Sequence, residues 1–227
     1  MQDSITDALR RQATDEALNA ARDWVFRAPE EAGAHRWLAV AWQQAGDTQA
    51  AVASIDRAIV LAPQDADLHV IRAALLMGQR QIEQAQSALS EASQLNPNQV
   101  QAYLLQAQLA YARGDVAEAD RQAKLAARVD PQHPQLAGIE SLVALSRQEY
   151  DLALSKATTG LTLSPDDAQL QYAAGFAYRG KGHLAFAEQA FRRLLERLPE
   201  ARHIRILMAE LIARQGRLQE AGDTLDE

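Results

Sequence analysis

The sequence predicts an all-α protein built from stacked helical hairpins, and two observations lead to that prediction. Six of the seven prolines recur at an interval of 34 residues, at Pro29, Pro63, Pro97, Pro131, Pro165 and Pro199. Proline lacks a backbone N–H and disfavours helical conformation in the residue before it, so each of these positions should end a helix. Aromatic residues make up only 5% of a chain dominated by Ala, Leu, Gln, Arg and Glu, which is typical of helical proteins. A fixed period of this length indicates a repeat array in which each unit packs on its neighbours.

The stretch from Ala32 to Asp65 contains the pattern of two helices joined by a short turn. Gly46 and Asp47 lie at its centre, and apolar residues at helical spacing stand on both sides: Leu38, Ala39 and Trp42 before the pair, and Ala51, Ile55, Ala58 and Leu61 after it. Glycine favours the left-handed conformation that ends many helices, and aspartate is a preferred N-cap of the next helix. Each repeat is therefore predicted to be a helix-turn-helix hairpin.

The phase of the prolines divides the chain into one array of seven units. We expect a single domain with repeats at 1–31 (partial), 32–65, 66–99, 100–133, 134–167, 168–201 and 202–227 (partial). In the first unit, a helix over Asp15–Arg27 should follow a shortened capping helix within Met1–Arg11. The fifth unit is the most irregular: Pro134 should begin its first helix, and Gln148-Glu149 replaces the Gly-Asp pair of the turn.

We call the six prolines that recur every 34 residues the ladder prolines. Small residues recur at fixed positions when each repeat is numbered so that its ladder proline is position 32. Position 8 is small in six repeats and position 20 is alanine in seven, because short side chains let two helices approach closely. These residues are Ala39, Ala73, Ala107, Ser141, Gly175 and Ala209 at position 8, and Ala17, Ala51, Ala85, Ala119, Ala153, Ala187 and Ala221 at position 20. The pattern resembles the tetratricopeptide repeat family. The resemblance implies a right-handed superhelical solenoid of about six to seven helix-turn-helix hairpins, whose concave groove binds a segment of another protein.

The resemblance also implies which side chains line that groove, because in this family the first helix of each hairpin faces it. The implied groove residues are Arg36, Val40, Gln43, Val70, Met77, Leu104, Gln108, Tyr111, Leu142, Tyr172, Phe176, Arg179, Ile206 and Glu210. The middle of this set is apolar, which favours a peptide or an amphipathic helix anchored on Tyr111, Tyr172 and Phe176. Packing between the repeats themselves is an equally good interpretation of the same apolar residues.

No catalytic or metal-binding constellation is recognisable in the sequence. The chain has no cysteine, and none of its five histidines belongs to an HExxH motif or a carboxylate cluster. His35 and His69 share position 4 of adjacent repeats and are interpreted as packing residues between helices. The basic turn Arg179–His183 lacks the GxxxxGK[ST] spacing of a phosphate loop. We therefore expect no enzyme activity, no cofactor and no metal.

The charge and hydropathy of the chain bear on its partners and its compartment. A net charge of −7 and a pI near 5.3 argue against nucleic acid or an anionic membrane surface as a partner. No apolar run approaches the length of a membrane span, so we expect no membrane insertion and a cytoplasmic protein, or a periplasmic one if a signal peptide was removed. A local excess of arginine is interpreted as a solvated helical face or as an anchoring patch for an acidic partner: Arg192, Arg193, Arg197, Arg202, Arg205, Arg214 and Arg217.

These observations lead to two main functional hypotheses. The first is a bacterial, non-catalytic scaffold whose concave groove binds a peptide or an amphipathic helix of another protein. The second is the N-terminal regulatory or substrate-recruiting region of a larger enzyme that continues past Glu227, because no polar cap is visible at that end. The same uncapped terminal repeat also allows for self-association.

Overall fold

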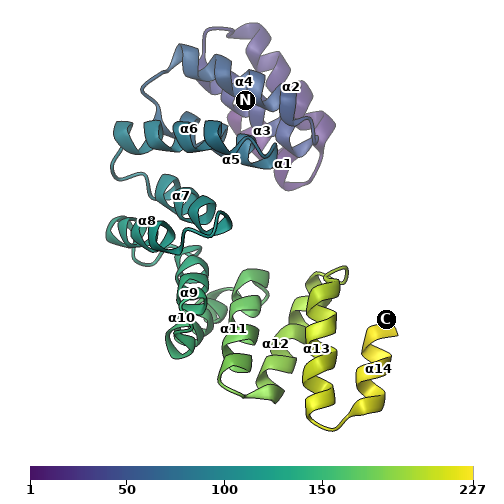
Figure 1. The fold of residues 1–227 in the computed structure, drawn as a ribbon. Coiled ribbons are helices and arrows are strands. Elements are labelled where there is room, and N and C mark those ends of the chain that lie inside the picture. Colours follow the sequence, from purple (N-terminus) through teal and green to yellow (C-terminus); the bar gives the residue numbers. More distant parts are fainter. Residues whose placement is uncertain (227) are drawn as a thin grey trace. The chain divides into compact units, whose positions relative to one another are not determined.

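The computed structural model describes residues 1–226 and contains fourteen helices with no strand in that range, which confirms the predicted all-α class (Figure 1). The helices are α1 (Gln2–Arg10), α2 (Thr14–Arg27), α3 (Ala32–Gln44), α4 (Thr48–Leu61), α5 (Ala66–Gly78), α6 (Ile82–Leu95), α7 (Val100–Ala112), α8 (Val116–Val129), α9 (Leu136–Ser146), α10 (Tyr150–Leu163), α11 (Ala168–Gly180), α12 (Leu184–Arg197), α13 (Arg202–Arg214) and α14 (Leu218–Asp226). Consecutive helices pair into hairpins joined by short turns.

The ladder prolines stand immediately after helices, as predicted. Each of the six ends a hairpin, because the helix before it stops two residues earlier: Arg27, Leu61, Leu95, Val129, Leu163 and Arg197 are the last helical residues. The next helix follows after the proline turn, and α3, α5, α7, α11 and α13 start in register with the ladder. The proline period of the sequence is thus the period of the hairpins.

The fifth repeat departs from the prediction that Pro134 begins its first helix. That helix, α9, starts at Leu136, and Pro134 lies in the preceding turn. Two hydrogen bonds to His133 stabilise this turn. The His133 Nδ1 accepts one from the Gln135 N–H at 3.3 Å, and the His133 carbonyl accepts the other from the Leu136 N–H at 3.0 Å. These bonds and the restriction that Pro134 places on His133 delay the helix by two residues.

The turns inside the hairpins share one backbone conformation, whatever residue occupies them. Gly46 has φ +81°, and the Asp47 side chain caps α4 by accepting a hydrogen bond from the Ala50 N–H at 2.9 Å, as the sequence predicts. Three other turns use glycine in the same way, at Gly114, Gly182 and Gly216. Where glycine is missing, Gln12, Arg80 and Gln148 still adopt φ near +60°. These three non-glycine residues therefore carry backbone strain.

A side chain at position 4 satisfies the carbonyl of the ladder proline six residues earlier. The donor differs from repeat to repeat, but the distance stays between 2.7 and 3.1 Å in His35, His69, Tyr103, Gln171 and Arg205. Because a carbonyl oxygen can only accept, each histidine donates from Nε2. His69 is 6% exposed, so this histidine has a structural role in closing the proline turn. The fifth repeat has Ala137 at this position, which cannot donate.

The chain forms two compact units, residues 1–109 and 110–227. In the first unit, Ile5 and Ala17 belong to one buried cluster, Ile55 and Leu68 to a second, and Leu76 and Leu89 to a third. Each cluster joins the helices of one hairpin to the first helix of the next or the last of the previous one. The core of this unit is therefore a row of small clusters rather than one centre.

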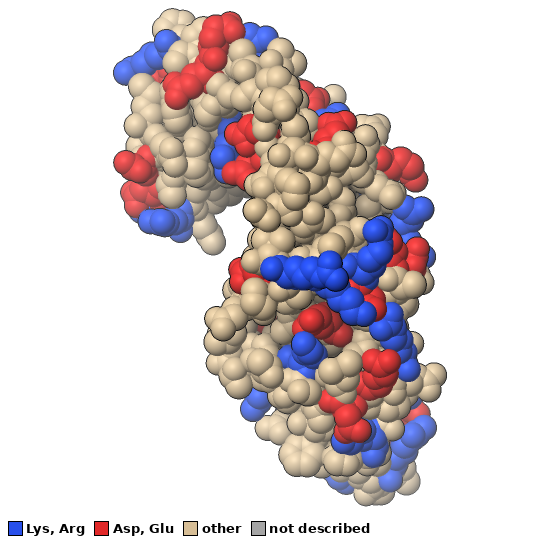
Figure 2. Space-filling view, turned by 90° about the vertical axis from the view of Figure 1, so that its left-hand side faces the viewer, with Lys and Arg blue, Asp and Glu red and all other residues tan. Residues whose placement is uncertain are grey.

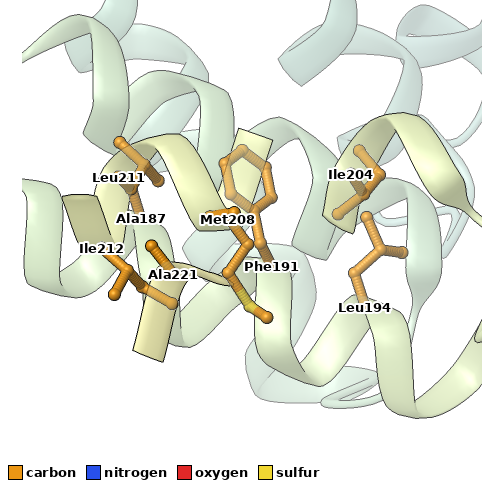
Figure 3. Close-up of a cluster of buried hydrophobic side chains, with 9 residues drawn as sticks. Ala187, Phe191, Leu194, Ile204, Met208, Leu211, Ile212 and Ala221 are labelled. Carbon is orange, nitrogen blue, oxygen red and sulfur yellow. The ribbon is translucent and has the colours of Figure 1, made fainter. Parts of the chain in front are cut away.

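In the second unit one hydrophobic cluster joins α11, α12, α13 and α14, and Figure 3 shows its buried side chains. Phe191 is fully buried at its centre. A Cβ atom on Gly175, the small residue at position 8 of this repeat, would lie 2.3 Å from Phe191 Cε1. The absence of a side chain at Gly175 is what lets Phe191 occupy the space between α11 and α13.

A buried carboxylate ties α12 to the turn between α13 and α14. The Glu188 side chain is 10% exposed and accepts hydrogen bonds from Arg217 Nη1 at 2.7 Å, Arg192 Nη2 at 2.9 Å and Gln215 Nε2 at 3.0 Å. Burial alone would raise the pKa of Glu188, but these hydrogen bonds, led by those from Arg217, outweigh burial and lower the pKa. The charged form of Glu188 is therefore part of the folded structure at neutral pH.

Candidate functional site

The predicted groove residues fall on both compact units. Arg36, Val40, Gln43, Val70, Met77, Leu104 and Gln108 belong to residues 1–109, and Tyr111, Leu142, Tyr172, Phe176, Arg179, Ile206 and Glu210 belong to residues 110–227. In the first unit, Val70 is 8% exposed and Leu104 is fully buried, so neither offers appreciable surface to a ligand. Arg36 lies 3.7 Å from the Asp67 carboxylate, which also accepts a hydrogen bond from Gln99. Among the first-unit residues of the predicted set, Arg36 thus takes part in a polar contact, and Val70 and Leu104 belong to the core.

The second unit contains an open cavity of about 410 Å³ that brings three of the predicted residues together. Tyr111 reaches it from the end of α7, Leu142 from α9 and Tyr172 from α11. The remaining lining residues are Ala168, Gln169, Leu194, Leu198, Ala201, His203 and Ile204. Apolar side chains form most of this wall, and the phenol oxygens, the Gln169 amide and the His203 ring supply its polar atoms. We call these ten residues the concave pocket.

Leu194 on α12 and Leu198 directly after it complete this pocket, and the groove template includes neither of them. Leu194 is 2% exposed and forms the floor, whereas Leu198 is 48% exposed at the rim. Leu198 directly precedes a ladder proline, where the other repeats carry Ala28, Ala62, Asn96, Asp130 and Ser164. The single bulky apolar residue in that series is a sequence signal that marks this repeat as different.

Tyr172 is held in place by an aromatic contact that continues into the core. Its ring centroid lies 4.5 Å from that of Phe176, and the Phe176 ring meets Phe191 edge-on at 5.2 Å. Burial, with a smaller contribution from the nearby Tyr111, raises the pKa of the Tyr172 phenol, so the hydroxyl stays neutral at physiological pH. The Tyr111 hydroxyl accepts a hydrogen bond from Ser146 Oγ at 3.3 Å. Both phenols are thus positioned before any ligand arrives.

The polar members of the predicted set in this unit bind one another. Arg179 Nη2 lies 3.4 Å from Glu210 Oε2, and Arg214 Nη2 lies 2.6 Å from Glu210 Oε1. Ile206, one turn before Glu210 on α13, is 56% exposed. In this arrangement Glu210 pairs with two arginines, and an apolar side chain lies one turn away on the same helix.

Three of the seven arginines in the cluster that the sequence singles out form ion pairs, and a fourth donates to a backbone carbonyl. Acidic partners within 4 Å hold Arg192, Arg214 and Arg217, and Arg205 donates to the Pro199 carbonyl. Over residues 1–226, Arg193, Arg197 and Arg202 take part in no ion pair. Figure 2 likewise shows lysine and arginine side chains interspersed with aspartate and glutamate on the face it presents.

Residues 1–226 contain no group of three or more His, Cys, Asp or Glu side chains arranged to hold a metal ion. Within the same range, none of the helices combines the length and the apolar character that crossing a bilayer requires.

Comparison with known proteins agrees with the hairpin architecture. A family model described as "Tetratricopeptide repeat" matches residues 3–66, 72–134 and 172–227, which together make up well over half of the chain. No curated protein matches the chain in sequence.

Several solved structures share the fold at low sequence identity. A chain of the APC/C hetero-tetramer Cut9–Hcn1 is similar with a TM-score of 0.84 and 16% identity over 98% of this chain and 48% of that one, so the present chain spans about half its length. Pseudomonas aeruginosa PilF is similar with a TM-score of 0.77 and 20% identity over 91% of this chain and 94% of that one. YrrB, described as having an unusual peptide-binding site, gives a TM-score of 0.58 and 20% identity over 76% of this chain and 89% of that one.

Proposed function

Because this chain belongs to the tetratricopeptide repeat family and has the fold of a protein-interaction scaffold, we propose that its second unit binds an apolar segment of a partner protein in the concave pocket. The observation that carries the proposal is the convergence of Tyr111, Leu142 and Tyr172 around one open cavity of about 410 Å³. Proteins with this fold are generally non-catalytic scaffolds, and their function lies in such surface sites.

The size of the pocket indicates what it takes from a partner. Pockets that enclose a whole small-molecule ligand measure roughly 300–1,000 Å³, so this one lies near the lower end of that range. A volume of this kind suits one or two large apolar side chains that project from a peptide or an amphipathic helix. The rest of the partner segment would lie across Ile206 and the Arg179–Glu210 pair.

The pocket is also preorganised, which favours binding. Tyr172 is already stacked on Phe176, and Leu194 is already buried beneath the cavity. Side chains that are ordered before binding lose little conformational entropy on binding, so more of the apolar contact energy appears as affinity. Tyrosine side chains in this situation are frequent hot spots, because they combine a large apolar face with a polar tip.

The structural neighbours support a protein ligand in general terms. YrrB is described by its peptide-binding site, and the Cut9–Hcn1 structure is a hetero-tetramer. Under the alternative hypothesis, in which the chain is a regulatory or substrate-recruiting region of a larger enzyme, the concave pocket would bind its ligand in the same way. The two hypotheses differ only in whether a catalytic domain is part of the same protein.

Peptide selection with the full chain tests the proposal. Peptides enriched from a displayed library would be measured by fluorescence anisotropy against the wild type, Tyr172→Ala and Leu198→Ala, with Phe26→Ala as the matched control. Phe26 is 86% exposed on the first unit, far from the concave pocket in sequence. We expect affinity losses of about tenfold or more for the pocket variants and an unchanged affinity for Phe26→Ala.

Circular dichroism would confirm that each variant is folded, and the rim residue Leu198 keeps the test valid if Tyr172→Ala is unstable. Selected peptides that bind both pocket variants as tightly as the wild type would refute the concave pocket as the binding site.

A further inference from the structure

A second hollow, separate from the concave pocket, lies between α10, α11 and α12 of the same unit. It measures about 270 Å³ and is lined by Thr158, Leu161, Thr162, Gln171, Ala174, Tyr178, Phe186, Gln189, Ala190 and Arg193. It shares no residue with the concave pocket. Since an α-helix turns once in about 3.6 residues, Ala174 and Tyr178 lie on the side of α11 opposite to Gln169 and Tyr172. We call it the α10–α12 pocket.

One wall of this pocket is an exposed aromatic cluster. The rings of Tyr178 and Phe186 stack with centroids 5.3 Å apart, and the His183 ring lies 6.4 Å from each of them. Phe186 is 55% exposed. The other repeats carry Glu16, Ala50, Gln84, Glu118, Leu152 and Glu220 at the same position. A phenylalanine here leaves apolar surface in water, yet the ring is already aligned by its stacked neighbours.

The same helix that carries Phe186 also carries Arg193, about two turns further along α12 and on the same face, and this arginine has no ion-pair partner among residues 1–226. Arg57, at the equivalent position of the second repeat, lies 3.1 Å from Glu30, which is 27 residues earlier. The residue equivalent to Glu30 in the sixth repeat is Asp166, whose side chain is shorter by one methylene and makes no ion pair with Arg193. No acidic side chain lines the pocket. The Arg193 guanidinium therefore remains available at its edge, beside the Gln189 amide.

We propose that the α10–α12 pocket is a second docking site, and that it binds a partner segment carrying a carboxylate next to an aromatic or long aliphatic side chain. The apolar side chain would stack on Tyr178 and Phe186, and the carboxylate would pair with Arg193. The small volume admits one such side chain. Charge complementarity selects the acidic neighbour, because an unpaired guanidinium in a wall without carboxylates attracts an anion and repels a cation.

The occupant is identified with short peptides and the full chain. Ac-Asp-Phe-Asp-NH2 is titrated into ¹⁵N-labelled protein at millimolar concentrations, where single-anchor peptides bind measurably by NMR. We expect shifts of the backbone amides of Thr158, Tyr178, Phe186 and Arg193, with those of Tyr111 and Tyr172 unchanged. Two matched peptides serve as controls: Ac-Asn-Phe-Asn-NH2 lacks the carboxylates, and Ac-Asp-Ala-Asp-NH2 lacks the aromatic ring. The affinity of each should be lower by about fivefold or more.

Two protein variants complete the test. Arg193→Gln and Phe186→Ala change exposed side chains, so both variants should remain folded. Each substitution should lower the affinity for the Asp-Phe-Asp peptide by about fivefold or more. Tyr172→Ala, which tests the concave pocket, should leave this binding unchanged. The proposal is overturned if the shifts map to Tyr172, if the Asn-Phe-Asn peptide or Arg193→Gln binds equally well, or if no shifts appear. Concentration-dependent dimerisation that Phe186→Ala abolishes would assign the pocket to a second copy instead.

Discussion

Replacing Arg80 or Gln148 by glycine should stabilise the protein. Both residues have φ +60° in the turn of their own hairpin, and Gly46 and Gly114, at the equivalent position of two other hairpins, have φ near +80°. The left-handed conformation costs a non-glycine residue about 1–2 kcal/mol, whereas glycine loses roughly 0.5–1 kcal/mol more backbone entropy on folding. The difference predicts a net gain of about 0.5–1 kcal/mol in the free energy of unfolding for each substitution.

Urea unfolding followed by circular dichroism at 222 nm measures this gain, and the chain offers two matched controls. Arg80→Ala removes the same side chain but keeps Cβ, so it should not stabilise. Gly46→Ala should destabilise by about 1 kcal/mol through the backbone alone, because nothing lies within 4 Å of the added Cβ. Equal gains from Arg80→Ala and Arg80→Gly would show that side-chain loss, and not the turn conformation, is responsible.

Three further substitutions test the packing and the electrostatics. Glu188→Gln should cost about 2 kcal/mol at pH 7, since the charged form accepts hydrogen bonds from two arginines. Because its pKa is lowered in the folded state, the stability that Glu188 contributes is present above its unfolded pKa and is lost as pH falls through the folded pKa. Unfolding curves of the glutamine variant should therefore depend less on pH in the acidic range, and parallel curves would contradict the lowered pKa. Gly175→Ala should cost about 1–3 kcal/mol in thermal unfolding through its clash with Phe191, and pairing it with Phe191→Leu should recover part of the loss. His69→Phe should cost about 1 kcal/mol by removing the bond to the Pro63 carbonyl, and His69→Gln should lose less because glutamine makes the equivalent bond in the sixth repeat; equal losses would argue against that bond.

The hairpins could be predicted from the sequence because their signals are local. Proline stops a helix through its own ring, and a Gly-Asp pair ends one helix and caps the next, so neither depends on distant residues. The start of α9 could not be predicted in the same way. A proline at the first helical position and a proline in the turn before a helix look alike in sequence, and the bonds to the His133 ring and carbonyl that decide between them depend on the geometry of the folded turn.

The repeat template assigns Tyr111, Leu142 and Tyr172 to the first helices of three hairpins, and the structure brings these three side chains to one cavity. That they bind a partner stays a prediction. The template does not identify Leu198, which directly follows the last residue of a second helix, or the burial of Leu104. A template position gives the direction of a side chain from its helix, while burial depends on which neighbouring side chains are large enough to cover it.

The measurement that tests the central claim most directly is an NMR study of the chain bound to a selected peptide. Intermolecular NOEs between the peptide's bulky apolar side chain and the rings of Tyr111 and Tyr172, together with the Leu142 methyl groups, are the predicted result. NOEs from that side chain to any other surface, with none to these three residues, would contradict a scaffold that binds its partner in the concave pocket.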